Sequence, residues 1–422
     1  MRKYYRYSLL VFMCLCLSSQ AFGARITFAP RLSLSEEYTD NVFRSKDNRE
    51  EDFISRVSPG ATLDITGKES GLSLSYDPSY NFYRNNPDLN SWSHAASLNA
   101  RSQFTRNTQG FLRDTLIHSE DPALDQSVSG RTGRDAYTRN AAVVGITNQF
   151  GAQNAVTLQY SHTEYRDWST PRDDSTTYSP EVRLDYWFTR RWGSDALLRY
   201  TRGEFDITED FENTRADLRL LYNYSRHTNW FVRYAHTVMT YLGDSDDYQL
   251  YYPSIGFDYT PDETTSLSLE AGPLIRAYSD RKEEYGTSVF GEGRKTWPFK
   301  RGSLSAFVRN GLDYDYASAQ NLGLYYYTSV GGNAVYNFQE DLSGNLSASY
   351  GYNAYVDQSP ERYDNTFRAG MGLRYLVAYY CALNLNYSFY DLISTDDNQE
   401  FYENRVYLGV SFYTRSPYVL RK

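Results

Sequence analysis

The chain has 422 residues and a formal net charge of −9, with 23% charged and 41% hydrophobic residues. An acidic balance disfavours nucleic acid as a partner. Beyond the N-terminal leader, the longest apolar run, Leu376–Leu383, is too short for a membrane-spanning helix.

The N-terminus is predicted to be a secretory signal peptide covering residues 1–23. Basic residues precede the apolar run Ser8–Leu17, and the small residues Ala21 and Gly23 suit signal peptidase. Cleavage after Gly23 leaves residues 24–422 as a single domain. It also leaves Cys381 as the last cysteine, so the mature chain cannot form an intramolecular disulfide.

Strand-like segments then follow one another to the end of the chain with no helical period between them. They lie near 26–43, 53–66, 71–83, 93–104, 110–119, 136–150, 155–165, 177–188, 194–205, 214–225, 230–241, 248–260, 266–278, 286–296, 302–314, 323–338, 344–355, 363–376, 380–390 and 403–413. The sequence therefore predicts an all-β fold of about 20 strands, with 18 or 16 as alternatives.

The segment Thr176–Phe188 shows the pattern that the others repeat. Its even positions are apolar with aromatic ends, whereas its odd positions carry three charges near the centre. A strand sends alternate side chains to opposite faces, and about eleven residues suit a tilted membrane crossing. This alternation predicts one strand of a single antiparallel transmembrane β-barrel. A mean hydropathy of −0.64 agrees with alternating strands, which hide their apolar residues.

The connections alternate in length. Short ones such as Gly67–Ser70 and Arg106–Gln109 alternate with longer ones such as Ser119–Arg134 and Asp391–Tyr402, as in outer-membrane barrels. The longer connections are acidic, for example Asp206–Asn213, and could hold divalent cations against lipopolysaccharide. The simpler interpretation is a solvated loop. Outer-membrane lipid and lipopolysaccharide are the expected surroundings, in a Gram-negative bacterium.

Aromatic residues recur beside the short turns, on the apolar face of each strand. This placement predicts a girdle at the membrane interface. Its members are Phe104, Phe150, Phe188, Tyr224, Trp230, Tyr259, Phe338, Tyr375 and Phe412.

Five prolines, Pro59, Pro78, Pro180, Pro253 and Pro273, fall inside predicted strands on the apolar face. A closed barrel has no edge strand on which the missing N–H is harmless. For Pro59 and Pro273 we expect β-bulges.

Charged side chains on the opposite face of four successive strands are predicted to line the lumen of the barrel. They are Glu181, Arg183, Asp185, Arg199, Arg215, Asp217, Arg219 and Arg233. Lateral pairing of opposite charges would hold a polar wall together without any transport role. The alternative is a track for a hydrophilic or anionic solute, which the excess of arginines favours.

Catalysis has weak support. His118 and His162 each have a glutamate two residues later, an arrangement that arises readily by chance in a polar chain. Ligand clusters for a metal and glycine loops for a phosphate are absent from the sequence, so no cofactor is expected. We expect a non-enzyme rather than a barrel hydrolase. A propeller is disfavoured because the strands are too long for blades.

The motifs Glu36–Phe43 (EEYTDNVF), Val57–Leu63 (VSPGATL), Tyr76–Tyr83 (YDPSYNFY) and Tyr178–Tyr186 (YSPEVRLDY) give the chain a family likeness. It resembles the putative β-barrel porin 2 family and related outer-membrane proteins of exopolysaccharide and PEP-CTERM gene clusters. The resemblance implies a porin-like channel, with a link to exopolysaccharide export and its partner proteins. A structural or adhesive barrel without transport stays open as the alternative.

The last predicted strand, Asn404–Tyr413, resembles the C-terminal signal that the barrel-assembly machinery binds. The tail after Tyr413 departs from that signal, which usually ends the chain.

Overall fold

The computed structural model describes residues 24–124, 131–168, 174–279, 281–316 and 320–421. The predicted signal peptide, residues 1–23, lies outside the described residues. In the described part of the chain, no helix is long and apolar enough to cross a membrane.

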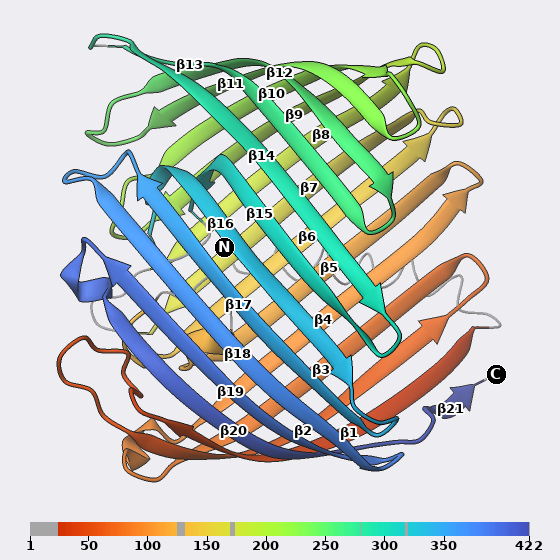
Figure 1. The fold of residues 1–422 in the computed structure, drawn as a ribbon, viewed down its shortest axis with the longest axis vertical. Helices are drawn as coiled ribbons and strands as arrows, with labels where there is room; N and C mark the ends of the chain where they lie inside the picture. The colour runs from red at the N-terminus through yellow and green to blue at the C-terminus, as the bar shows by residue number, and fades with distance from the viewer. Residues whose placement is uncertain (1–23, 125–130, 169–173, 280, 317–319, 422) are drawn as a thin grey trace, which may run out of the picture.

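Twenty long strands form a closed antiparallel barrel (Figure 1). They are β1 (Arg25–Thr39), β2 (Asp52–Thr66), β3 (Ser70–Tyr83), β4 (Ser91–Thr105), β5 (Thr108–Ser119), β6 (Tyr137–Gln149), β7 (Ala155–Asp167), β8 (Ser175–Trp187), β9 (Trp192–Phe205), β10 (Phe211–Asn223), β11 (Thr228–Tyr241), β12 (Tyr248–Asp262), β13 (Thr265–Tyr278), β14 (Glu284–Phe299), β15 (Gly302–Asp315), β16 (Gly323–Asn337), β17 (Leu342–Tyr355), β18 (Arg362–Ala378), β19 (Cys381–Ser394) and β20 (Phe401–Tyr413). Short 3-10 helices η1 (Pro87–Leu89), η2 (Pro122–Leu124) and η4 (Asp397–Gln399) lie in three connections. The predicted count of about 20 strands is confirmed.

The barrel closes between its first and last long strands. Residues Arg31–Thr39 of β1 pair with β20, and Ile26–Phe28 pair with a short added strand, β21 (Tyr418–Arg421). The tail that departs from the assembly signal therefore covers the part of β1 that β20 does not reach.

The short turns lie at one end of the barrel, here called the turn end, and the long connections lie at the other, the loop end (Figure 1). The predicted alternation of connections is thus confirmed. The first predicted strand, 26–43, is too long, because β1 ends at Thr39 and a turn follows.

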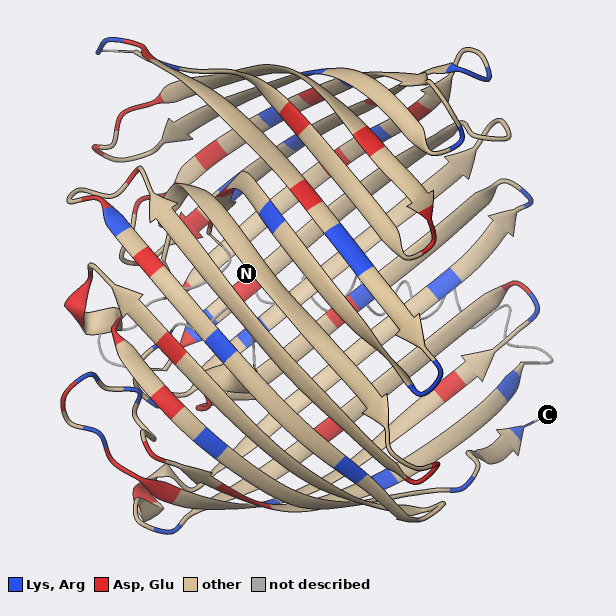
Figure 2. Ribbon diagram, in the orientation of Figure 1, with Lys and Arg blue, Asp and Glu red and all other residues tan. Residues whose placement is uncertain are grey.

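The alternation of each strand separates the outer face from the lumen. On β1, Leu32 and Leu34 are exposed on the outer face, whereas Glu37 and Thr39 are buried on the inner face. Charged residues accordingly appear along the strands as well as in the loops (Figure 2). The largest apolar cluster lies inside the barrel near the loop end, around Phe211, Tyr248 and Leu324.

Four of the five strand prolines predicted on the apolar face lie in two facing pairs, whereas Pro180 lies opposite Tyr160 of β7. The β2–β3 pairing is interrupted between Val57↔Tyr80 and Ala61↔Tyr76, where Pro59 and Pro78 lie opposite each other. The register is the same on both sides of this gap, so the expected bulge at Pro59 is wrong. Two missing N–H groups share one interruption, which limits the number of unpaired carbonyls.

The same arrangement occurs in β12 and β13, where Pro253 faces Pro273 in a gap without a register change. The bulge expected at Pro273 is therefore also wrong. A Cβ atom at the neighbouring Gly272 would lie 2.0 Å from the carbonyl oxygen of Pro253, so this close approach requires glycine.

Phe412 and Ser411 test the assigned faces of the closing strand. Phe412 is exposed on the outer face, whereas Ser411 contacts the Ser33 hydroxyl at 3.3 Å on the inner face. We expect Phe412→Asp to reduce the folded yield more than Ser411→Asp, because a charge costs more against lipid than in the lumen. Folded yield is measured by heat-modifiable migration on gels. Equal yields would contradict the assigned faces.

Candidate functional site

The eight residues of the predicted charged track lie on one wall of the lumen, formed by β8 to β11. On the same strands, the alternate residues Val182, Leu198, Leu218 and Val232 are exposed on the outer face. Strand alternation therefore places the charges inside. The structure thus brings the eight charged residues together on one wall.

Seven of the eight residues line a polar cavity of about 410 Å³. Further lining residues come from β9 and β13, including Asp195 and Glu270, and Phe231 of β11 contributes an aromatic surface. Glu181 does not line this cavity but bonds Arg199 beside it, with a distance of 2.7 Å from Nε to Oε2. This volume is in the range of small-molecule pockets.

Like charges face each other across several strand pairs. Arg199 lies opposite Arg215, and Arg219 lies opposite Arg233. Directly opposed like charges destabilise a sheet, so their neighbours must compensate. The wall therefore depends on ion pairs with carboxylates that do not lie directly opposite.

These ion pairs connect β10 and β11 with the next two strands. Arg233 binds Asp217 at 2.9 Å and Glu270 at 2.6 Å, and Arg219 binds Asp258 at 2.8 Å. Burial favours such pairing, since Asp217 and Glu270 are each only 13% exposed at the side chain. Most of the wall is thus internally neutralised.

Two arginines are held more loosely. Arg183 lies 4.0 Å from Glu181 and its side chain is 52% exposed, and Arg215 lies 3.4 Å from Asp217. Both line the cavity. They are therefore the guanidinium groups best placed to meet a solute.

The excess of arginines over acids among the eight predicted residues does not extend to the whole wall. Asp195, Asp258 and Glu270 also belong to this wall, so six carboxylates accompany its five arginines. Asp195 has the same parity as Arg199 on β9, and the same alternation extended to β12 and β13 finds the other two. The sequence contained this signal, but the predicted track stopped at four strands.

The nine residues of the predicted aromatic girdle are all exposed and lie near the turn end. Further exposed aromatics extend the same band, and neighbouring rings touch. For example, the Tyr186 and Phe188 ring centroids are 5.0 Å apart, and those of Tyr336 and Phe338 are also 5.0 Å apart.

In the described residues, no group of three or more His, Cys, Asp or Glu side chains could hold a metal ion. The rings of His94 and His118 lie 5.9 Å apart across β4 and β5. His118 Nδ1 lies 2.8 Å from the hydroxyl of Thr138 rather than beside a carboxylate.

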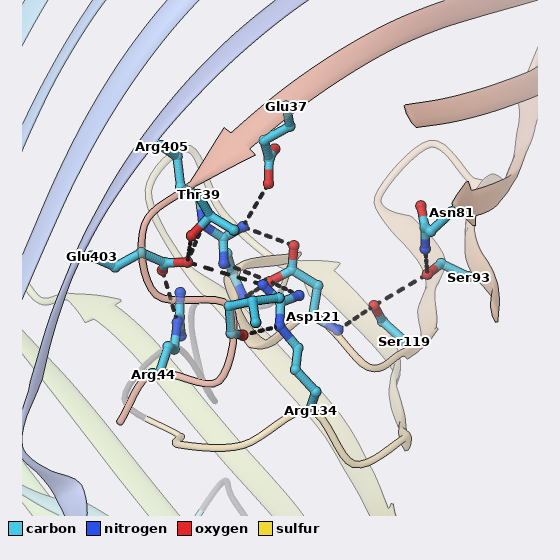
Figure 3. A network of polar contacts seen from close by, with 12 residues as sticks. Glu37, Thr39, Arg44, Asn81, Ser93, Ser119, Asp121, Arg134, Glu403 and Arg405 are labelled. Atoms are coloured by element: carbon cyan, nitrogen blue, oxygen red, sulfur yellow. Dashed lines mark hydrogen bonds and ion pairs between the residues drawn. The ribbon is translucent and has the colours of Figure 1, made fainter. Parts of the chain in front are cut away.

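A second polar cluster, which the sequence did not predict, closes one side of the loop end. This cluster, here called the latch, surrounds Asp121 from the β5–β6 connection (Figure 3). Arg405 of β20 binds both carboxylate oxygens of Asp121, at 2.8 and 3.0 Å. Arg56 of β2 and Arg134 approach the same carboxylate to 3.1 and 3.2 Å.

Glu403 forms the other half of the latch. It accepts hydrogen bonds from Thr39 at 2.9 Å, from Arg44 at 3.0 Å and from Arg405 at 2.7 Å. Its side chain is 2% exposed. The latch therefore joins the two closing strands to the loops that follow β1 and β5.

The motif residues Asp40 and Asn41 lie at the rim of the latch. Asp40 accepts bonds from the backbone and side chain of Asn404, both at 2.8 Å. Asn41 donates to the carbonyl oxygens of Ser45 and Tyr402, also at 2.8 Å. The motif thus fixes the end of β1 to β20, which explains why these residue types occur at the turn.

Charge controls the ionisation of Asp121. Burial by itself would raise the pKa of this carboxyl, but Arg134, Arg405 and Arg56 outweigh burial and hold the pKa well below its usual value. A depressed pKa stabilises the fold above the unfolded-state value of about 3.9. The stability that this carboxylate contributes is therefore fully present at neutral pH and is lost as the pH falls from about 4 toward the lower pKa of the folded state.

Comparisons with known proteins agree on the architecture. The model of a family described as putative beta-barrel porin 2 matches residues 22–188 and 309–414. No significant match was found among curated proteins.

Solved structures with the same fold are large outer-membrane barrels. The apoprotein form of the FrpB iron transporter from Neisseria meningitidis has a TM-score of 0.54 and 12% identity, over 92% of this chain and 81% of that one. The siderophore receptor PirA from Pseudomonas aeruginosa has a TM-score of 0.50 and 10% identity, over 92% and 80%. At these identities the likeness shows the fold alone.

Asp121→Asn tests the latch. The amide keeps the shape but leaves Arg56, Arg134 and Arg405 with Glu37 and Glu403 as their remaining carboxylate partners. Breaking a buried pair in this way should lower the free energy of unfolding by about 3–5 kcal/mol. Heat-modifiable migration against temperature measures the change. Asp397→Asn, at an 85% exposed carboxylate bonded to Lys46, is the control and should leave the transition unchanged. Equal transitions in both variants would contradict the latch.

Proposed function

Because this chain belongs to the family described as putative beta-barrel porin 2, we propose that it is a porin-like channel for hydrophilic solutes across the outer membrane of a Gram-negative bacterium. The family and the fold assign a transmembrane β-barrel and an outer-membrane location. The solute pathway through the lumen is our proposal.

The observation that carries the proposal is the charged cavity on the β8–β13 wall. A barrel that served only as a scaffold could fill this wall with apolar or small polar groups at lower desolvation cost. Instead, five arginines and four carboxylates, Asp185, Asp195, Asp217 and Glu270, line a cavity of small-molecule size. Such a surface replaces part of the hydration shell of a charged or polar solute.

Selectivity should follow the local lining rather than the net charge of the protein, because electrostatic effects fade over about 10 Å at ordinary salt. The carboxylates of Asp195, Asp258 and Glu270 offset the anion preference that the arginines alone would give. The channel should therefore discriminate only weakly between anions and cations.

The membrane-facing roles follow from the outer surface. We propose that the aromatic girdle positions the turn end at the periplasmic interface, with the loop end in the lipopolysaccharide layer. The closing strand, β20, is the proposed contact for the barrel-assembly machinery. These contacts require no cofactor and no catalytic group.

The link to exopolysaccharide export, with its partner proteins, rests on the sequence resemblance. Deleting the gene and measuring released polysaccharide tests this link separately from channel activity. Unchanged release would remove the export role and leave the channel proposal intact.

A structural or adhesive barrel without transport is the second candidate. The observation that favours it is the filled loop end, where the latch and the apolar cluster occupy lumen-facing positions. Conductance of the reconstituted protein distinguishes the two functions, since a permanently closed barrel carries no current.

Replacing Arg199 and Arg215 with Ser tests the solute path. This change removes two positive charges and leaves Glu181 without its 2.7 Å partner, so ion selectivity in planar bilayers should shift toward cations. Arg202→Ser is the matched control, because Arg202 is paired with Glu204 and Glu212 on the outer face of the same strand, β9. Unchanged selectivity in the double variant would remove the transport role of these arginines.

A further inference from the structure

The barrel wall is split at the loop end between β14 and β15. Their pairing runs from Phe299↔Gly302 to Gly291↔Asn310 and stops there, although both strands continue. Beyond this point, Glu284–Phe290 pair with β13 alone, and Gly311–Asp315 pair with β16 alone. Figure 1 shows β14 continuing along the barrel surface while the β15–β16 hairpin turns away from it.

One face of the β15–β16 hairpin changes its surroundings along its length. Midway along the two strands, Val308 and Val330 on this face are each 48% exposed on the outer surface. Toward the loop end, Leu324 on the same face is only 1% exposed and belongs to the apolar cluster inside the barrel. The hairpin must therefore bend inward after the split.

The bent part of the hairpin packs against the inner wall of β10–β14. Tyr316 lies 4.9 Å from Phe211 between ring centroids, and Tyr326 lies 6.5 Å from Phe290 of β14. Tyr314 and Leu312 pack against the same cluster. An overlap of two layers of the wall explains why a barrel lumen contains so large an apolar core.

Asp357 clips the hairpin in this position, and Asn321 adds bonds to the hydroxyl of Thr208 at 2.9 Å and to the carbonyl oxygen of Glu209 at 3.3 Å. Asp357, from the β17–β18 connection, accepts a bond from the backbone N–H of Leu324 at 2.7 Å. It also accepts bonds from the hydroxyls of Tyr241 and Tyr248, at 3.0 and 3.1 Å, and pairs with Arg276 of β13. Asp357 thus joins the hairpin to the wall that it covers.

The residues of this hairpin would also fit beside the unpaired edge of β14. Continuing the β14–β15 register would put Val289 opposite Leu312 on the outer face and Ser288 opposite Asp313 on the inner face. Val289 is already 63% exposed on the outer surface. The extended pairing would satisfy the free edge of β14 and keep apolar residues outside.

We propose that the β15–β16 hairpin is a gate with two positions, one tucked into the lumen and one paired with β14. The tucked position covers the wall of Phe211 and Tyr248, at the loop-end side of the charged cavity, and restricts exit from it. The paired position completes the barrel and clears that wall. This inference rests on the proposed channel function, because a gate controls flow only through an open lumen.

Disulfide trapping tests the movement itself. In a Cys381→Ser background, Val289→Cys with Leu312→Cys should cross-link on oxidation, because directly opposite residues of paired strands have the Cβ spacing that a disulfide needs. Gly293→Cys with Val308→Cys, which are partners in the present pairing, is the positive control. Cross-linking of the control pair alone would overturn the gate, whether or not the protein conducts.

Conductance tests the consequence. Oxidation of the Val289→Cys, Leu312→Cys protein in a planar bilayer should raise conductance, and reduction should reverse the gain. Asp357→Ala, which removes the clip, should raise conductance without any disulfide, whereas Asp88→Ala in the exposed η1 helix should not. Cross-linking with unchanged conductance would overturn the gate alone. Absence of current in every variant would contradict the channel and, with it, the gating role.

Discussion

Backbone hydrogen bonding around a closed sheet is the constraint on which this structure depends. Lipid offers no hydrogen-bond partner, so each strand must pair on both sides at membrane depth. The β1–β20 pairing satisfies this requirement, and β21 extends it along the remaining part of β1. The facing prolines follow the same rule, because Pro59 and Pro78 confine their missing donors to one short interruption.

The backbone-pairing constraint relaxes at the loop end, and two buried polar clusters lie there. Side chains take over from backbone pairing in two places. The latch joins β1, β2 and β20 through Asp121 and Glu403, and Asp357 fixes the tucked hairpin where β14 and β15 separate. In both places, buried carboxylates accept hydrogen bonds from segments that are far apart in the sequence. Such clusters give specificity of arrangement at the cost of desolvation.

Between the filled loop end and the turn end lies the charged wall of β8–β13. Its near balance of guanidinium and carboxylate groups keeps a buried polar surface stable and still leaves Arg183 and Arg215 loosely paired. The same residues can therefore keep the wall stable and, in the proposed channel, leave arginines free enough to contact a solute. The tucked hairpin then lies where access to this wall from outside can be controlled.

The sequence by itself determined the features that repeat along the chain. Alternation with a period of two identified the barrel, and it placed aromatic residues such as Phe188 on the outer face and the charges from Glu181 to Arg233 on the inner face. Each of these depends only on a residue and its strand neighbours. The sequence also showed that Asp40 and Asn41 belong to a family motif, but it did not show that they fix the end of β1 to β20.

Tertiary structure alone decided what meets across the barrel. In the latch, Glu37, Asp121 and Glu403 lie in one cluster although they come from distant segments of the chain. No local sequence pattern specifies that these residues lie together. Tyr314 and Leu324 share a strand face with the outward Val308 and Val330, but the separation of β15 from β14 beyond the Gly291–Asn310 pair turned that face inward. Periodicity fixes which side chains share a face, whereas the pairing of whole strands decides where that face lies.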